Sequence, residues 1–484
     1  GRLRGIGVTS LARSPNTANM PTVAEQGFPG FEALSWFGLM APAGTAPTIG
    51  EKVRAEAMRV LADGGMRERF AALGLDTVGS TPEAMRACGC AQSEDAPMKA
   101  SLFYLPSIGS RAEIEAGMAG MRGDLYQRML RDLSEQIRLA DELGYDSVSF
   151  TEHHFHIEGF EVSNNPVLLD LYFAMQTKRI RVGQLGIVLP AANPMRVAED
   201  IAMLDHMTGG RACAGFARGY QRRWVDVMGQ QTHGIHGALP HQHDEIDAAN
   251  RAAFEENLRI IKKCWTEEML EYQGKYWRIP AGPTPWTLET TRLYGKGVED
   301  GILKSVGIVP KPLQKPHPPL FQPFASSENT IRFCAQESIT PILPAMHPSH
   351  ESKLYSVYSE VAGKPKGRDM GVLRDVIIAD TDEEAMALWR DSGQFTGRAW
   401  FEPFGFRKGL IDPATGKVPT PEEIIAQGYA YVGTVDTVLR GMEASQRRQP
   451  VDWTMCYTYN GLVPHGTLMK SIERFWTRVM PRFA

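Results

Sequence analysis

The residues best suited to acid–base chemistry lie in the segment FTEHHF (150–155), where Glu152 precedes His153 and His154. The apolar run DSVSF ends at Phe150, so the segment lies at the end of a predicted strand. Imidazole titrates near neutral pH and suits general acid–base catalysis. If the strand continues, only one histidine faces a ligand, and Glu152 could fix a ring tautomer as an acceptor. A catalytic histidine and a structurally hydrogen-bonded pair both remain open.

Further candidates follow in three later segments. Gly186 interrupts the apolar run QLGIVLP, and a glycine inside a strand often marks the close approach of a ligand or another backbone. Arg218 follows the strand-like ACAGFA, where it suits a phosphate or carboxylate, although pairing with a local carboxylate is equally compatible. Ser326 and Ser327 precede a predicted helix, where they form either an anion site or a simple N-cap.

Strand and helix patterns alternate from residue 98 to the end of the chain. Each strand-like run is followed by a helical pattern, and in the helix that follows the first strand the apolar residues recur on one face. Eight such pairs predict a (β/α)8 TIM barrel with insertions, in which catalytic residues lie at the carboxyl ends of the strands. The predicted strands cover residues 99–106, 146–150, 180–190, 212–217, 318–324, 340–345, 371–379 and 452–459.

A change of composition separates the beginning of the chain from this pattern. Residues 1–90 predict a short α/β fragment, with a strand in SWFGLM and a helix that begins near Pro47. The polar stretch GCAQSEDAP predicts a linker over residues 91–97, with a new start at Met98. Residues 98–484 form the predicted barrel domain.

Composition excludes several classes of function. The chain has 484 residues, of which 22% are charged, and a net charge of −4, so it lacks the basic surface of nucleic-acid-binding proteins. No apolar run approaches the length of a membrane span. Isolated cysteines favour a reducing compartment, and we expect a cytoplasmic protein. Cys88 and Cys90 form a weak C-x-C metal signal, and we predict no metal site.

FTEHHF, VGQLGIVLPAANPMRVAEDIAMLDHMTGGR and GFARGY, in this order, closely resemble the bacterial luciferase-like flavin monooxygenases. The resemblance covers nearly all of residues 98–484 and is most specific from 147 to 220. It implies a (β/α)8 barrel that binds reduced FMN, activates molecular oxygen and oxidises a small organic substrate. It also implies a homodimer. No dinucleotide-binding fingerprint occurs in a suitable context, so we expect a separate NAD(P)H:flavin reductase to supply the reduced flavin.

The resemblance also implies roles for individual residues. His153 matches the histidine implicated as catalytic base, and the other matched positions belong to the flavin site. The Leu185–Gly186 bond matches a cis peptide packed against the isoalloxazine ring, and Arg218 and Arg251 match ligands of the FMN phosphate. The complete set of implied cofactor-binding residues is Glu152, His154, Leu185, Gly186, Arg218, Tyr220, Arg251, Ser326 and Ser327.

Two departures from the luciferase pattern limit what the resemblance implies. Luciferases carry a reactive cysteine where this chain has Ala217, and an acidic residue where it has the run Arg222–Arg223–Trp224. The resemblance therefore does not extend to light emission or to an aldehyde substrate. The insertion that contains His233, His236, His241 and His243 favours a polar lid over a metal loop.

The first part of the chain resembles a different family. The segment NMPTVAEQGFPGFEALSWFGLMAPAGTAPTIGEKV is similar to the end of tricarboxylate-type periplasmic solute-binding proteins. Those proteins are much longer, so we interpret residues 1–90 as a fusion remnant or a mis-set start that contributes no activity. Three alternatives stay open beside the FMN monooxygenase: a deazaflavin-dependent oxidoreductase on the same barrel, a solute-binding protein, and a metallohydrolase that uses the histidines.

Overall fold

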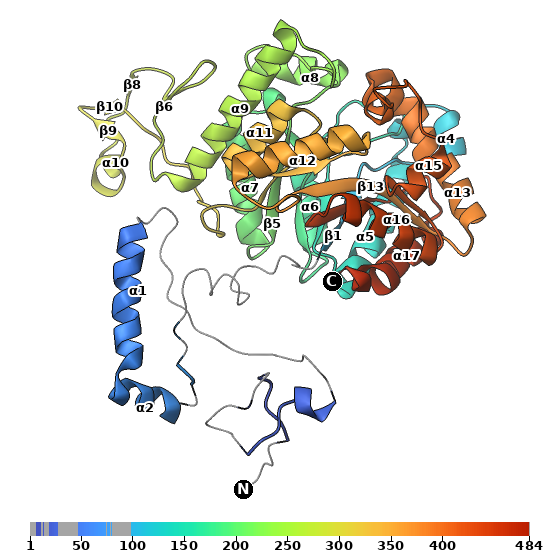
Figure 1. The fold of residues 1–484 in the computed structure, drawn as a ribbon. Helices are drawn as coiled ribbons and strands as arrows, with labels where there is room; N and C mark the ends of the chain where they lie inside the picture. The colour runs from blue at the N-terminus through green and yellow to red at the C-terminus, as the bar shows by residue number, and fades with distance from the viewer. Residues whose placement is uncertain are drawn as a thin grey trace. The chain divides into compact units, whose positions relative to one another are not determined.

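The computed structural model describes residues 6–10, 13, 19–27, 47–73, 75–77, 79 and 98–483. The chain divides into two compact units, Gly1–Ala96 and Pro97–Ala484. The second unit contains the predicted site, and its strands form a closed parallel barrel enclosed by helices (Figure 1).

Eight parallel strands close the barrel in the order β1-β2-β3-β5-β11-β12-β13-β15, with β15 paired to β1 again. Strand β1 closes the barrel because it pairs on both sides: Ser101 of β1 pairs with Ser147 of β2 and with Met455 of β15. The predicted (β/α)8 fold is therefore confirmed. The strands are β1 (Lys99–Tyr104), β2 (Ser147–Phe150), β3 (Arg181–Gln184), β5 (Ala212–Ala217), β11 (Leu320–Gln322), β12 (Thr340–Leu343), β13 (Gly371–Ile378) and β15 (Trp453–Tyr457).

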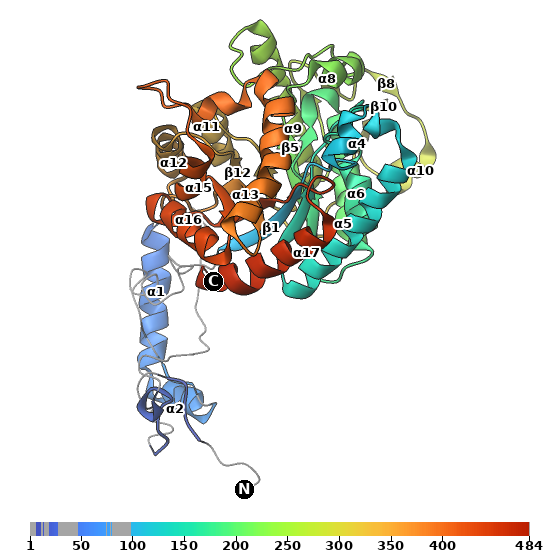
Figure 2. The ribbon, with the colours of Figure 1, turned by 90° about the vertical axis from the view of Figure 1, so that its right-hand side faces the viewer.

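Helices follow the strands and surround the barrel (Figure 2). The main layer consists of α5 (Gly123–Leu143), α6 (Pro166–Ala174), α7 (Pro194–Met207), α9 (Glu245–Thr266), α11 (Glu328–Glu337), α12 (Pro348–Ala362), α13 (Asp382–Asp391), α16 (Val435–Arg448) and α17 (His465–Arg474). Shorter helices lie in the connections: α4 (Arg111–Glu115), α8 (Arg222–Met228), α10 (Glu289–Tyr294), α14 (Gly393–Thr396) and α15 (Pro421–Ala426).

Helix α5 shows how sequence period becomes packing in this unit. Its buried residues include Leu125, Met129, Leu133, Ile137 and Ala140, the face predicted from the apolar period. Gly144 ends the helix with a left-handed backbone at φ 103°, a conformation that glycine adopts without steric cost. The apolar face of α5 is therefore buried along the length of the helix.

Three details differ from the sequence prediction. The predicted third strand is interrupted after Gln184 and resumes as β4 (Ile187–Val188), which pairs with β5. An additional strand, β14 (Ala430–Gly433), pairs with the carboxyl half of β13. Short strands in the connection between α9 and β11 form antiparallel pairs with one another and do not pair with the barrel strands. These are β6 (Tyr272–Gln273) with β7 (Arg278–Ile279), and β10 (Ile302–Leu303) with β8 (Thr284–Pro285) and β9 (Val298–Glu299).

The first unit contains two described α-helices, α1 (Pro47–Ala62) and α2 (Gly64–Ala72). The predicted helix near Pro47 is therefore present, although Val53 and Val60 on its apolar face are exposed. The predicted strand in SWFGLM, the Cys88–Cys90 pair and the 91–97 linker lie outside the described residues. Within the described residues, none of the helices combines the length and apolarity that crossing a membrane requires.

Candidate functional site

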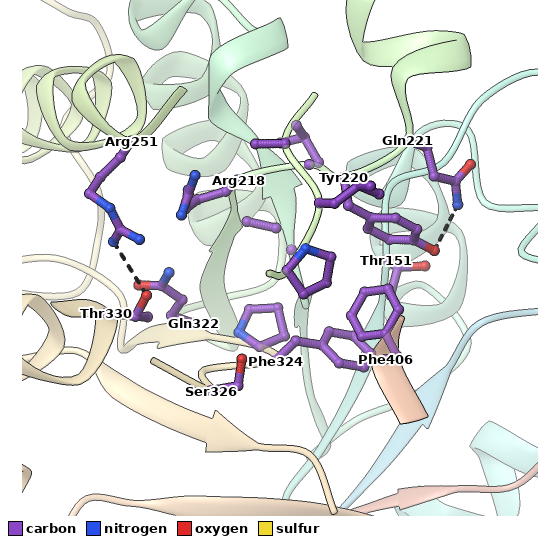
Figure 3. Close-up of a pocket in the computed structure, with 18 of the residues that line it drawn as sticks. Thr151, Arg218, Tyr220, Gln221, Arg251, Gln322, Phe324, Ser326, Thr330 and Phe406 are labelled. Carbon is purple, nitrogen blue, oxygen red and sulfur yellow. Dashed lines mark hydrogen bonds between the residues drawn. The ribbon is translucent and has the colours of Figure 1, made fainter. Parts of the chain in front are cut away.

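A cavity of about 980 Å³, including its open mouth, lies at the carboxyl ends of the barrel strands. Residues that follow β2, β3, β5 and β11 line it together with the insertion before α9 (Figure 3). Most residues singled out from the sequence meet here: Glu152, His153, Leu185, Gly186, Arg218, Tyr220, Arg251, Ser326 and Ser327 all line the cavity. Residues far apart in the chain are thus brought to one place by the barrel.

The two adjacent histidines separate because the strand ends before them. Strand β2 stops at Phe150, so the expected alternation along a continued strand does not apply. His153 lines the cavity, with its backbone N–H donating to the Ser163 carbonyl at 2.9 Å. The ring of His154 packs on Trp224 with 4.9 Å between centroids, and its Nε2 lies 3.2 Å from Glu152 Oε1. Glu152 therefore contacts His154, not His153, and its other oxygen accepts from the Val188 N–H at 2.7 Å.

A buried polar network lies behind His153. The amide nitrogen of Gln221 donates to Glu161 Oε2 at 2.7 Å and approaches His153 Nδ1 at 3.4 Å. Tyr220 donates its hydroxyl to Glu161 Oε1 at 3.2 Å. Burial, and then the charges of His156 and His154, hold the pKa of His153 well below its ordinary value. The cavity is therefore presented with a neutral imidazole.

Glu161 is the residue in this network that can store a proton. Its side chain is 2% exposed, and burial raises the pKa of its carboxyl to about 7. His156 lies beside it, with Nδ1 2.8 Å from the Phe160 carbonyl and Nε2 2.7 Å from Gln221 Oε1. Burial lowers the pKa of His156 to about 4, so the shared proton favours the Glu161 carboxyl, which takes up and releases it around neutral pH.

The proton on Glu161 sets the orientation of the Gln221 amide. A neutral His156 that donates from Nδ1 to a carbonyl needs a donor at Nε2, which the Gln221 amide supplies when it is turned over. The Gln221 oxygen then faces Glu161 and accepts the carboxyl proton. In the structure itself, the Gln221 amide nitrogen faces Glu161 and His153, and its oxygen faces His156 Nε2.

His153, His156 and Glu161 also carry the ligand types of a metal site. Within the described part of the chain, their ligand atoms lie within 4.8 Å of one another. The Gln221 amide nitrogen is in contact with two of the three groups, at 2.7 Å and 3.4 Å. A protein donor thus joins two of the three groups, so the geometry favours a proton network.

The histidines of the insertion diverge instead of converging on one point. His236 lies 3.1 Å from Asp226 Oδ2, His241 Nε2 lies 3.0 Å from the Gly405 carbonyl, and His233 packs on Trp277. His243 lines the cavity together with Ala238, Leu239, Pro240 and Gln242. This insertion therefore forms one wall of the cavity, and its histidines have separate partners.

Gly186 stands where two strands approach closely. A Cβ at this position would lie 2.6 Å from the Phe216 backbone nitrogen and 2.7 Å from the Gly215 carbonyl carbon. The close approach predicted from the mid-strand glycine is thus an approach to another backbone. The peptide bond between Leu185 and Gly186 is cis, and both residues face the cavity.

Two guanidinium groups lie at one end of the cavity (Figure 3). Arg218 forms an ion pair with Asp247 and donates from Nε to Asn250 Oδ1 at 3.0 Å. Arg251 donates to the Thr330 hydroxyl at 3.5 Å and has no carboxylate partner among the described residues. Burial, and then the charge of Arg218, lower the pKa of Arg251. This end of the cavity therefore holds two cations for one carboxylate, a surplus that suits an anion.

Ser327 is the N-cap of α11, because its hydroxyl accepts from the Thr330 N–H at 3.3 Å. The simple N-cap that the sequence allowed for Ser327 is therefore present in the structure. Its position still brings the first turn of α11 to the same end of the cavity as Arg251. The Ser326 carbonyl lies 2.8 Å from His350 Nε2, and Ser326 also lines the cavity.

The sequence interpretation missed Glu161, His156 and Gln221. A signal for Glu161 is present, because it is a single acidic residue in the apolar run GFEV, where an ionised side chain is costly to bury. No comparable signal marks Gln221, whose importance depends on the turn that follows β5.

Comparisons with known proteins match the two parts of the chain to two different families. The sequence profile of the luciferase-like monooxygenases matches residues 115–451, and that of the tripartite tricarboxylate transporter family receptor matches residues 1–89. The oxygenase component of a flavin-dependent trigonelline monooxygenase from Acinetobacter baylyi is 25% identical over 74% of this chain and 90% of its own length. An alkanal monooxygenase alpha chain from Photorhabdus luminescens is 25% identical over 71% of this chain and 79% of its own length.

A solved structure is similar in fold. It is the oxygenating constituent of 3,6-diketocamphane monooxygenase from Pseudomonas putida, a Baeyer–Villiger monooxygenase in complex with FMN. It matches 80% of this chain and 99% of its own length with a TM-score of 0.60 and 23% identity.

Proposed function

The chain belongs to the luciferase-like monooxygenase family, and from that premise we propose that it is a two-component monooxygenase that uses reduced FMN and molecular oxygen. The observation that carries the proposal is the cavity that joins a pair of cationic side chains at one end to a neutral imidazole at the other. We expect the phosphate to bind at the first end and the reacting ring to lie near the second.

The residues present fit FMN at the phosphate end. Arg251 offers a guanidinium without a carboxylate partner in the described structure, and Arg218 adds a second positive charge. The hydroxyl groups of Ser326, Ser327 and Thr330 and the first turn of α11 provide neutral donors nearby. The partly compensated charge supports a dianionic phosphate over a neutral ligand.

The other end of the cavity fits a flat ring system. Leu185 and Gly186 face the space from one side, and the absence of a side chain at Gly186 allows the adjoining backbones to pack closely. His153 lies in the same wall with its pKa lowered by burial. Reduced flavin, when bound, supplies the electrons that activate molecular oxygen.

His153 is the proposed catalytic base in this arrangement. A neutral imidazole can accept a proton from the substrate, or from another reacting group during the transfer of oxygen. Gln221 and Tyr220 connect that imidazole to Glu161, whose carboxyl holds a proton near neutral pH. Glu161 is not in the cavity lining, so its proposed role is to position and buffer the network. Glu152 and His154 support the same wall through their mutual contact.

The proposed enzyme depends on a partner protein for its reduced flavin. A separate NAD(P)H:flavin reductase supplies reduced FMN, as the term oxygenase component implies for the Acinetobacter relative. The active form is a homodimer in the cytoplasm, and residues 1–90, the linker 91–97 and the barrel 98–484 are three successive parts of the chain. The first part contributes nothing to the reaction.

The test uses the full chain with a flavin reductase, NADH and FMN. A panel of small organic compounds is screened for oxygen uptake that is coupled to product, with isotopically labelled molecular oxygen. We expect one labelled oxygen atom in the product and tight anaerobic binding of reduced FMN. Tighter binding of a reduced deazaflavin, or product without the label, would overturn the proposal in favour of an oxidoreductase.

A further inference from the structure

A second cavity lies beside the first at the carboxyl end of the barrel. It encloses about 1500 Å³ including its mouth, and Phe324 and Phe406 line both cavities. These two rings meet edge to face, with 5.7 Å between centroids, so they form a shared wall. Part of the boundary between the two cavities therefore consists of aromatic rings.

Seven aromatic side chains line the second cavity, beside aliphatic residues, two arginines and two acids. Tyr457 and Tyr459 stack on one another with 3.9 Å between centroids, and both are 5% exposed. The remaining rings of the lining are Phe324, Trp389, Phe401, Phe406 and Tyr429. Aromatic faces carry negative electrostatic potential, and rings that surround a space attract organic cations.

One carboxylate faces these rings. Asp375 lines the cavity and is partly exposed to it, while Tyr459 donates to Oδ1 at 2.7 Å and Trp389 donates to Oδ2 at 2.7 Å. Each oxygen keeps a free lone pair after these bonds. No Lys, Arg or His forms an ion pair with Asp375 in the described structure. Two neutral donors therefore hold a carboxylate that has no ion-pair partner in the described structure.

The neighbouring arginine does not supply the missing charge. Adjacent residues of a strand point to opposite faces, so Arg374 points away from the cavity when Asp375 points into it. Arg374 is fully buried, and its guanidinium pairs with Glu351 of α12 at 2.8 Å. At the rim, Arg407 pairs with Glu402 at 3.2 Å, and Arg398 is exposed. Of the two acids in the lining, Glu402 is therefore exposed and paired with Arg407, whereas Asp375 is partly buried and forms no ion pair in the described structure.

We propose that the second cavity binds an organic cation, with its positive nitrogen near Asp375 and its apolar body among the aromatic rings. This inference rests on the proposed function in one respect only, because it identifies the cation as the substrate to be oxidised. A purely structural aspartate would have its oxygens turned into the protein, whereas Asp375 lies in the cavity wall. Burial raises the pKa of Asp375, and a bound cation reverses that shift.

Gly393 allows the carboxylate and the indole to meet in this wall. A Cβ at position 393 would lie 2.5 Å from Trp389 Nε1 and 2.9 Å from Asp375 Oδ2. Because the glycine has no side chain, Trp389 can donate to Asp375 while both line the cavity. The binding arrangement therefore depends on three elements, β13, α13 and the start of α14.

The test compares ligands of one shape and different charge. N-methylpyridinium and toluene are isosteric, and benzoate reverses the charge. Each is titrated against the full chain without flavin, by calorimetry and by the fluorescence of the cavity tryptophan. We expect N-methylpyridinium to bind about tenfold or more tightly than toluene, with benzoate weakest. Equal affinity for the cation and toluene, or a preference for benzoate, would overturn the proposal.

Asp375→Asn removes the charge and keeps the hydrogen bonds, because the amide oxygen accepts from Trp389 and the amide nitrogen donates to the Tyr459 oxygen. We expect this variant to lose the preference for the cation and to keep its affinity for toluene. Glu402→Gln is the matched control, since that acid lies exposed at the rim, and it should change cation affinity far less. Equal losses in the two variants would contradict a specific role of Asp375.

FMN is titrated separately against the same proteins, so the two proposals fail independently. If FMN does not bind but the cation binds through Asp375, the cation site stands and the monooxygenase proposal fails. If FMN binds and the cation does not, only the present inference fails. With FMN bound, N-methylpyridinium should also perturb the flavin absorbance through the shared wall, and Asp375→Asn should abolish that perturbation.

Discussion

The two cavities at the carboxyl end of the barrel share a wall of two phenylalanines, but they present opposite charges at their ends. The first places Arg218 and Arg251 near one carboxylate, whereas the second places Asp375, which forms no ion pair in the described structure, among aromatic rings. The comparison indicates how one scaffold can bind two different molecules side by side. We expect charge to select the molecule for each cavity, and the shared aromatic wall to hold the two molecules close together.

The largest expected effect concerns the histidine of the first cavity. His153→Ala should lower the rate of product formation by about 100- to 10,000-fold, the usual loss when a positioned general base is removed. FMN affinity should be retained, because the phosphate end is unchanged. His154→Ala is the matched control, since that ring packs on Trp224 instead of lining the cavity. Similar rates for the two variants would remove the distinction between the adjacent histidines.

The next effect concerns the anion end of the first cavity. Arg251→Ala removes a charged donor with no carboxylate partner in the described structure and should weaken FMN binding by about 10- to 100-fold. Riboflavin lacks the phosphate, so its affinity should change little. Arg398→Ala, at the rim of the second cavity, serves as the control and should leave FMN binding intact. A loss of both flavins to the same extent would place Arg251 elsewhere in the site.

The barrel and its first cavity could be predicted because their signals are local. Glycine in QLGIVLP, arginine after ACAGFA and histidine after DSVSF each stand at a strand end, and the barrel brings strand ends together. Strand β14 was missed because AYVG is a run of four residues within a connection. The small antiparallel pairs between α9 and β11 are shorter still, and their pairing depends on the path of the connection.

The second cavity could have been suspected from one detail of its sequence. Strand β13 reads GVLRDVII, where two adjacent charges interrupt an apolar run. Alternation places Arg374 and Asp375 on opposite faces, but the sequence cannot identify which face is the barrel interior. That choice depends on the partner Glu351 in α12 and on Tyr459 after β15. The chemistry of the second cavity is therefore set by contacts between distant segments.

Glu161, the buried acid behind the first cavity, should affect the pH dependence of stability. Burial raises the pKa of Glu161 to about 7 from 4.5, so between these values the folded protein keeps a proton that the unfolded chain has lost. The contribution of Glu161 to stability therefore falls as pH rises through this window and is constant above it. Glu161→Gln should remove that fall, on the order of 1–3 kcal/mol between pH 5 and pH 8.

Urea unfolding of the wild type and of Glu161→Gln at several pH values measures this difference. Glu402→Gln is the matched control, because an exposed acid should not change the slope with pH. Parallel curves for the wild type and Glu161→Gln would show that the carboxyl is ionised throughout, and the proposed proton store would then fail. The same variant should also lose the component of the rate profile that titrates near pH 7.

The smallest expected effect follows from the separation of the chain into two units. Every residue that lines either cavity lies between Thr151 and Tyr459, and Met98 is held by its backbone N–H, which donates to the Phe483 carbonyl at 2.9 Å. Deletion of residues 1–97 should therefore leave the affinities for FMN and N-methylpyridinium unchanged within about twofold. Calorimetry on both proteins measures this. Loss of the cation alone would mean that the first unit supports the second cavity, and loss of both ligands would favour the solute-binding interpretation of residues 1–90.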